Sequence, residues 1–149
     1  MATVKDIYID PRAVTRLYVL QPGSHEMAAW RWRMKGPIGL THHGKAELAN
    51  AIALAVFRGD MPSEDAAVAF QEIEDDFANG DLFYLDFLWR AALDRAFELS
   101  TKHSPTIGTR SLDVLHVACA LELKLSHFLT FDERQAKLAK ATGLKLMTI

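Results

Sequence analysis

Hydrophobic and polar positions follow two different spacings along the chain. Short apolar runs between charged or turn-forming residues predict strands, and apolar residues three and four positions apart predict helices. The expected strands cover residues 6–10, 38–41, 82–86, 127–131 and 144–148. The expected helices cover residues 13–20, 24–35, 43–58, 64–78, 87–103 and 133–142, and a further helix opens on Ser111.

This alternation of strands and helices predicts an α/β fold. Because a helix separates each strand from the next, the connections should be crossovers and the strands should run parallel. We expect a three-layer α/β sandwich with a central, mostly parallel sheet of about five strands. The sequence contains no internal repeat, linker or low-complexity segment, so residues 1–149 are expected to form a single domain.

Residues 108–132 carry the strongest chemical pattern, which reads GTRSLDVLHVACALELKLSHFLTFD. The helix that opens on Ser111 has Asp113 in its first turn and His116 one turn later. The apolar strand that follows leads to Asp132. In an α/β sheet, helix starts and the carboxyl ends of strands face the same crevice, so the two carboxylates are predicted to meet there.

Two more acids occupy comparable positions, because Asp10 ends the first strand and Glu47 lies early in the third helix. If these two converge with Asp113 and Asp132, four carboxylates form an all-oxygen site, which suits the hard cations Mg²⁺ or Mn²⁺. Such a cation lowers the pKa of bound water and stabilises charge on a phosphate. The pattern therefore favours hydrolysis of phosphodiester bonds.

Each acid also has a purely structural interpretation. Asp113 suits the positive end of a helix dipole, and Asp132 is a good N-cap for the last helix. Asp10 could be a turn residue at a strand end, and Glu47 could be a solvated helix residue. The combination of all four with the α/β architecture favours the metal site.

Composition and charge narrow the possible functions. The net charge is -2, and residues 60–86 hold nine acids and no Lys or Arg. Bulk positive charge therefore cannot drive nucleic-acid binding, and any such binding must be local.

The single cysteine, Cys119, excludes an internal disulfide, argues against a thiolate zinc site and is expected in the core. No signal peptide or membrane span is expected, which predicts a cytoplasmic protein.

The run RSLDVLHVACALELKLSHFLTFDERQAKLAKATGLKLM resembles the C-terminal half of PIN-domain proteins, in particular the VapC-like toxins of toxin–antitoxin pairs. The opening IYIDPRAVTRLYVLQPGS and the helix KAELANAIAL extend the resemblance over nearly the whole chain. It implies a metal-dependent endoribonuclease that cuts single-stranded regions of RNA. It also implies a homodimer and a VapB-like antitoxin that blocks the site.

The resemblance assigns roles to the four acids. Asp10, Asp113 and Asp132 would ligate or orient the Mg²⁺ or Mn²⁺ ion, and Glu47 would position or activate water. His116 is expected to pack or form a hydrogen bond rather than to take part in catalysis.

One departure from the family pattern follows the first acid, where Pro11-Arg12 replaces the usual pair of small hydroxyl residues. Arg12 either pairs with the site carboxylates or binds substrate phosphate. Arg110 is a second candidate for contact with substrate or site.

Two other functions stay open. The first is a PIN-like binding module with impaired catalysis. The second is a phosphatase-like metal hydrolase, but the sequence lacks the nucleophilic Asp-x-Asp motif that such an enzyme would need.

Overall fold

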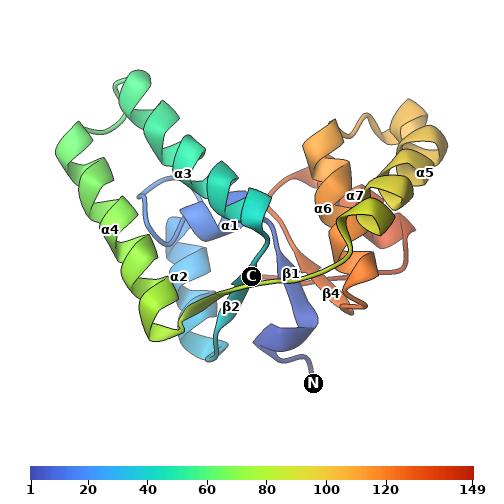
Figure 1. Ribbon diagram of the computed structural model, residues 1–149, viewed down its shortest axis with the longest axis horizontal. Helices are drawn as coiled ribbons and strands as arrows, with labels where there is room; N and C mark the ends of the chain where they lie inside the picture. Colours follow the sequence, from blue (N-terminus) through green and yellow to red (C-terminus); the bar gives the residue numbers. More distant parts are fainter. The chain divides into compact units, whose positions relative to one another are not determined.

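The computed structural model describes residues 1–149 and contains seven α-helices, a short 3-10 helix and five strands (Figure 1). After the 3-10 helix Val4–Asp6, the elements are β1 (Ile7–Ile9), α1 (Pro11–Thr15), α2 (Ser24–Arg33), β2 (Ile38–Leu40), α3 (His42–Phe57), α4 (Ser63–Asn79), β3 (Leu82–Tyr84), α5 (Trp89–Ile107), α6 (Ser111–Glu122), β4 (His127–Leu129), α7 (Glu133–Ala141) and β5 (Lys145–Leu146). The chain divides into two compact units. The first unit contains Met1–Asp10 and Asp86–Thr148, and the second contains Pro11–Leu85 together with Ile149.

The first unit is built on a parallel sheet with the strand order β1-β4-β5. Figure 1 shows β1, near the start of the chain, beside β4, near its end. Tyr8 pairs with Phe128 in the ladder, and the two buried rings stack with their centroids 5.4 Å apart. Helix α7 packs on β4 and β5, and α5 packs against α6. Residues Asp113–Ala120 of α6 are all buried, so this helix is the centre of the unit.

The second unit is built on the parallel pair β2 and β3, in which Ile38 lies opposite Leu82 and Leu40 opposite Tyr84. Helix α3 packs against α1 and α4, and α4 packs against β3. Leu48 and Ile52, one turn apart on α3, are completely buried. The apolar stripe that the sequence predicts for this helix is therefore its packing face.

The predicted α/β class and the parallel strand direction are confirmed, and all five strands form. The expected single sheet of about five strands is wrong, because the strands divide into a sheet of three and a sheet of two. Alternating strands and helices fix the direction of the strands, but they do not determine which strands pair. None of the helices is both long and apolar enough to cross a membrane.

Several predicted helix ends are also wrong. The helix expected over residues 13–20 spans only Pro11–Thr15, because the next residues form turns with hydrogen bonds to the third residue before them. Helix α2 begins at Ser24, as expected, but it ends at Arg33 rather than at residue 35; the Ser24 hydroxyl accepts from the Gln21 N–H and donates to the Val19 carbonyl. Helix α5 continues through Pro105 to Ile107. Proline removes one hydrogen bond of the helix, and the turn continues until Gly108, whose φ of +74° ends it.

The only thiol of the protein is inaccessible. Cys119 lies on α6 with an exposed fraction of 0%, as its apolar neighbours in the sequence predict. Burial, with a smaller contribution from the Glu122 carboxylate, raises the pKa of the thiol to about 12.

We therefore expect the folded protein to resist alkylation by iodoacetamide at pH 8. With the thiol pKa near 12, only about one thiol in ten thousand is ionised at this pH, and the thiolate is the reactive form. Mass spectrometry should detect alkylation of Cys119 only after unfolding in denaturant. Rapid labelling of the native protein would contradict this burial.

Candidate active site

The first candidate acid, Asp10, lies directly beyond the carboxyl end of β1. Its backbone N–H donates to the Leu129 carbonyl at 3.0 Å, which continues the β1–β4 ladder by one residue. The residue is only 2% exposed, although its side chain ends in a carboxyl group. A buried carboxylate requires hydrogen-bond donors or a cation, so this position needs a specific partner.

The second candidate acid, Asp113, lies in the first turn of α6, as the sequence predicts. The Arg110 Nε lies 3.3 Å from its Oδ2 atom, and the arginine side chain is 73% exposed whereas that of Asp113 is 9% exposed. An ion pair with so exposed a partner adds little stability. The carboxylate also benefits from the positive end of the α6 dipole.

The third candidate acid, Asp132, is the N-cap of α7. Strand β4 ends at Leu129 rather than at Phe131, so Asp132 belongs to the helix start. Its Oδ1 accepts a hydrogen bond from the backbone N–H of Gln135 at 2.9 Å. The structural interpretation of this acid is therefore confirmed. It leaves the metal role open, because a carboxylate can accept several hydrogen bonds or ligate a cation at the same time.

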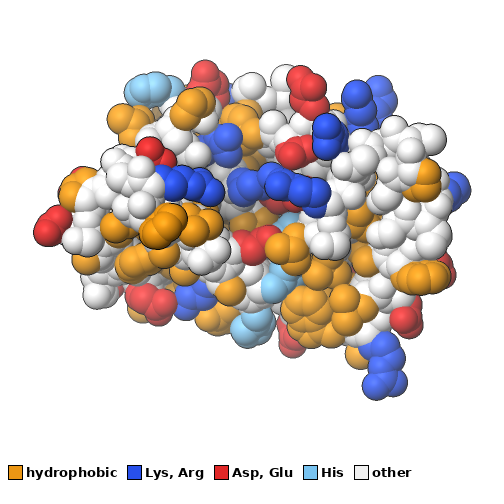
Figure 2. All heavy atoms as spheres, turned by 90° about the horizontal axis from the view of Figure 1, so that it is seen from above, with side chains coloured by type: hydrophobic (Ala, Val, Ile, Leu, Met, Phe, Trp, Pro, Cys, Tyr) orange, Lys and Arg blue, Asp and Glu red, His pale blue; other side chains and the backbone are white.

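Asp113 and Asp132 both line a pocket of about 420 Å³ in the first unit. The other lining residues are Gly108, Thr109, Arg110, Phe131, Glu133 and Arg134. The pocket therefore combines three carboxylates with two guanidinium groups, and it lies where α6 and α7 begin. The mixture of carboxylates and guanidinium groups in this pocket suits a cation together with a phosphate. Side chains of both charges also occur on the face of the molecule that Figure 2 shows.

The residue that sequence reasoning missed is Gln135 on α7. It is 0% exposed, and its Nε2 donates to Asp10 Oδ1 at 3.2 Å and to the Asp113 carbonyl at 3.3 Å. A signal was present in the sequence, because Gln135 lies on the helix face of the buried Leu138 and Ala139, three and four positions later. A polar residue within an apolar stripe needs a buried partner.

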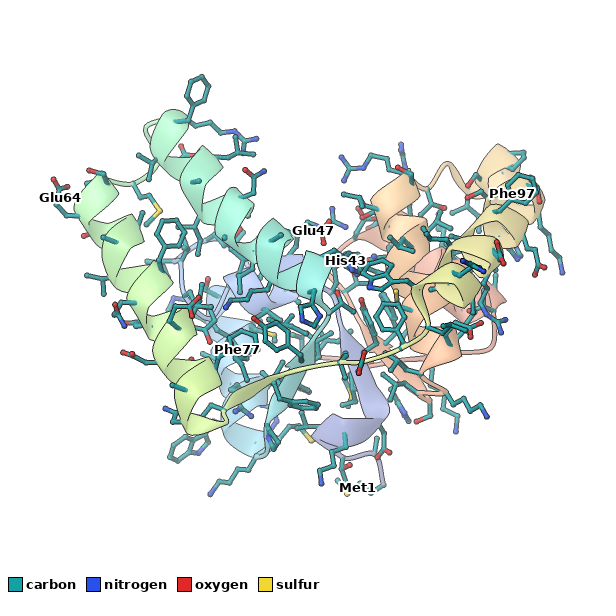
Figure 3. The ribbon with its side chains drawn as sticks, viewed as in Figure 1. Met1, His43, Glu47, Glu64, Phe77 and Phe97 are labelled. Atoms are coloured by element: carbon teal, nitrogen blue, oxygen red, sulfur yellow. The ribbon has the colours of Figure 1, made fainter.

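The fourth candidate acid, Glu47, lies on α3 in the second unit, one turn beyond His43 (Figure 3). Lys45 holds this part of α3 in place. Its Nζ lies 2.8 Å from Glu74 Oε1, 3.2 Å from the Tyr84 hydroxyl and 4.5 Å from the centre of the Phe77 ring. The hydrogen bond with Glu74 is the main reason that the pKa of Lys45 is raised. The contacts of Lys45 thus fix the part of α3 that carries Glu47. That Glu47 acts together with the three aspartates stays a prediction.

The remaining candidates are Arg12 and His116. Arg12 is the second residue of α1, and its carbonyl accepts from Arg16 Nη1 at 2.7 Å. Pro11 begins this helix, where the missing N–H of proline costs nothing. His116 is buried with its Nδ1 2.6 Å from the Tyr8 hydroxyl, which confirms the expected hydrogen-bonding role.

The donor chemistry of the three aspartates fits a divalent cation. The structure contains no compact group of three or more His, Cys, Asp or Glu side chains arranged around one point. Gln135 nevertheless forms hydrogen bonds with all three residues. Its side chain donates to the Asp10 carboxylate and to the backbone carbonyl of Asp113, and its backbone N–H donates to the Asp132 carboxylate. Carboxylate oxygens are the preferred ligands of Mg²⁺ and Mn²⁺, so these residues suit such an ion.

The comparison with protein families agrees with this chemistry. The family described as PIN domain matches residues 7–141, which include all of the candidate acids. A search of the curated proteins found no similar sequence.

The dual role of Asp132 can be separated by two substitutions. Asp132→Asn keeps a good N-cap, so the free energy of unfolding should change by only a few tenths of a kcal/mol. Asp132→Ala removes the cap of α7 and should lower the free energy of unfolding by about 1 kcal/mol. Urea denaturation without divalent cations measures both values. Equal losses in the two variants would show that capping is not what the side chain contributes.

Proposed function

Because the chain belongs to the PIN-domain family, whose members are generally metal-dependent nucleases, we propose that it is a divalent-metal-dependent endoribonuclease that cuts single-stranded regions of RNA. It hydrolyses phosphodiester bonds with the help of Mg²⁺ or Mn²⁺. We propose further that it acts in the cytoplasm as the toxin of a toxin–antitoxin pair, as the resemblance to VapC-like proteins implies.

The observation that carries this proposal is the hydrogen-bond network around Gln135. It joins Asp10, after β1, to Asp113 in α6 and to Asp132 at the start of α7. The network thereby links the side chains of Asp10 and Asp132 and the backbone carbonyl of Asp113, which come from distant parts of the sequence, and this supports the proposal that the three acids act together. Asp10 is a buried carboxylate that accepts a hydrogen bond from this network, which is the environment a buried metal ligand requires.

The proposed reaction assigns a role to each acid. Asp10, Asp113 and Asp132 would hold the divalent cation, and Glu47 would orient the attacking water and accept its proton. When bound, the cation would lower the pKa of water and neutralise charge on the phosphate. Arg110, which is largely exposed beside Asp113, would contact the RNA backbone.

The proposed protein partners are a VapB-like antitoxin and a second copy of the chain. Support comes from three large apolar side chains on α5, namely Trp89, Leu93 and Phe97, which are 38%, 53% and 71% exposed. They follow a spacing of four, so they share one face of the helix, and Figure 3 shows Phe97 on α5. Exposed apolar faces of this kind mark protein interaction sites.

A binding module with impaired catalysis is the second candidate function. The pair Pro11-Arg12 favours it, because a guanidinium follows Asp10 where the family has small hydroxyl residues. The presence of all four acids favours the nuclease.

The central prediction is metal-dependent cleavage of single-stranded RNA by the purified protein without a partner. Cleavage should require Mn²⁺ or Mg²⁺ and stop in EDTA. Asp113→Asn should lower the cleavage rate by about 100-fold or more, because it removes a charged metal ligand. A fluorescent oligonucleotide assay measures each rate.

The matched control is Asp94→Asn, which alters an exposed aspartate on α5 in the same unit. This control should cut RNA at the wild-type rate. If the wild-type protein neither cuts RNA nor binds Mn²⁺, the nuclease proposal is wrong and the binding module takes its place.

Arg12→Ser distinguishes the two roles of the arginine. If Arg12 contacts RNA phosphate, the Mn²⁺ affinity of the variant should equal that of the wild type, and KM for RNA should rise about tenfold. If the guanidinium instead pairs with the site carboxylates, Mn²⁺ should bind more tightly to the variant. Calorimetric titration with Mn²⁺, together with cleavage kinetics, measures both quantities.

A further inference from the structure

The side chain of Gln135 is a neutral polar group that is completely buried beside the candidate acids. Its amide makes three hydrogen bonds within the first unit. Thr130 Oγ1 donates to its Oε1 at 2.5 Å, while its Nε2 reaches Asp10 Oδ1 at 3.2 Å and the Asp113 carbonyl at 3.3 Å. Its backbone N–H also donates to Asp132 Oδ1. One residue is therefore bonded to all three aspartates.

The orientation of this amide is fixed by its neighbours. The Asp10 carboxylate and the Asp113 carbonyl are both acceptors, so only the NH₂ group can face them. The opposite orientation would place Oε1 against two acceptor oxygens and leave them without these donors. Thr130 completes the assignment, because its hydroxyl accepts from the Asp132 N–H at 3.0 Å and donates its own proton to Gln135. The chain of hydrogen bonds thus runs in one direction, from Asp132 through Thr130 and Gln135 to Asp10.

We propose that Gln135 is a positioning residue that sets the Asp10 carboxylate for binding of the divalent cation. This inference rests on the proposed metal-dependent function. Gln135 has no exposed surface with which to contact RNA, so it acts through Asp10. Fixing the carboxylate in advance means that little reorganisation is needed when the cation binds.

The neutrality of the amide matters for this role. A Lys or Arg at the same position would also donate to Asp10, but its positive charge would compete with the cation. An amide supplies the hydrogen bond without cancelling the negative charge that attracts the metal. The hydrogen bond from Gln135 therefore orients the Asp10 carboxyl group without placing a positive charge beside it.

The decisive variant is Gln135→Met, which keeps the length and approximate volume of the side chain and removes its amide. Calorimetric titration with Mn²⁺ alone should show affinity about tenfold weaker than wild type, the usual effect of losing a hydrogen bond to a metal ligand. At low Mn²⁺ the rate of RNA cleavage should fall, and excess Mn²⁺ should restore it. KM for RNA should not change at saturating Mn²⁺. Urea denaturation of the metal-free variant shows separately whether its packing is intact, because bound metal would also stabilise a loosely packed variant.

The matched control is Gln71→Met on α4 in the second unit. Gln71 Nε2 also donates to an aspartate, Asp75, at 2.9 Å, but this pair is exposed. The control should bind Mn²⁺ with wild-type affinity.

A second test variant, Thr130→Val, leaves Gln135 in place and removes the hydroxyl that holds its Oε1. Thr130→Val should also weaken Mn²⁺ binding, as Gln135→Met should. If Gln135→Met does not fold, the Mn²⁺ affinity of Thr130→Val tests the positioning role instead.

The possible outcomes separate this inference from the proposed function. Wild-type protein that binds Mn²⁺ but does not cut RNA would refute the nuclease, while a weaker affinity in Gln135→Met would still support the positioning role. Unchanged Mn²⁺ affinity in folded Gln135→Met would overturn the positioning role, even if the wild type is an active nuclease. Absence of Mn²⁺ binding to the wild type would overturn both.

Discussion

The parallel pairing of β1 with β4 is the contact on which the candidate site depends. It joins Ile7–Ile9, near the start of the chain, to His127–Leu129, near its end. The pairing is stabilised by complete burial of apolar side chains, among which Tyr8 and Phe128 stack directly. Asp10 follows the first of these strands and the capping segment of α7 follows the second. Without this ladder, Asp10 would not be held beside Gln135, and the network would lose its connection to the first strand.

The local elements of this fold could be predicted because their signals are local. Helices α3 and α7 have regular apolar stripes and clear starts and stops, so the predicted ends of both helices lie within one residue of the observed ends, and the predicted start of α6 at Ser111 is correct. The acids could be identified for the same reason, since a carboxylate at the end of an apolar run is visible in the sequence. Helix α5 was harder, because Pro105 usually signals an end and here lies in the last turn.

The pairing of elements and the buried polar contacts could not be predicted in the same way. Nothing in the spacing of β2 and β3 indicates that they form a separate sheet, because pairing depends on tertiary packing. The bond from Gln135 to Asp10 links positions 125 residues apart, and sequence patterns describe only near neighbours. The position of Gln135 on the apolar stripe of α7 was the one available clue, and it gives the burial of the residue but not its partner.

The distance in sequence between the two halves of the first unit also governs when the site appears during synthesis. A ribosome adds about 5–20 residues per second, so β1 waits roughly 6–24 s for β4, whose first residue, His127, pairs with Ile7. Closing so long a loop also carries an entropic cost that is recovered only once both strands are present. Asp10 therefore has neither its ladder partner nor Gln135 until residues 127–135 have been synthesised. A nascent chain that stops short of these residues can make neither the β1–β4 ladder nor the hydrogen bond from Gln135 to Asp10.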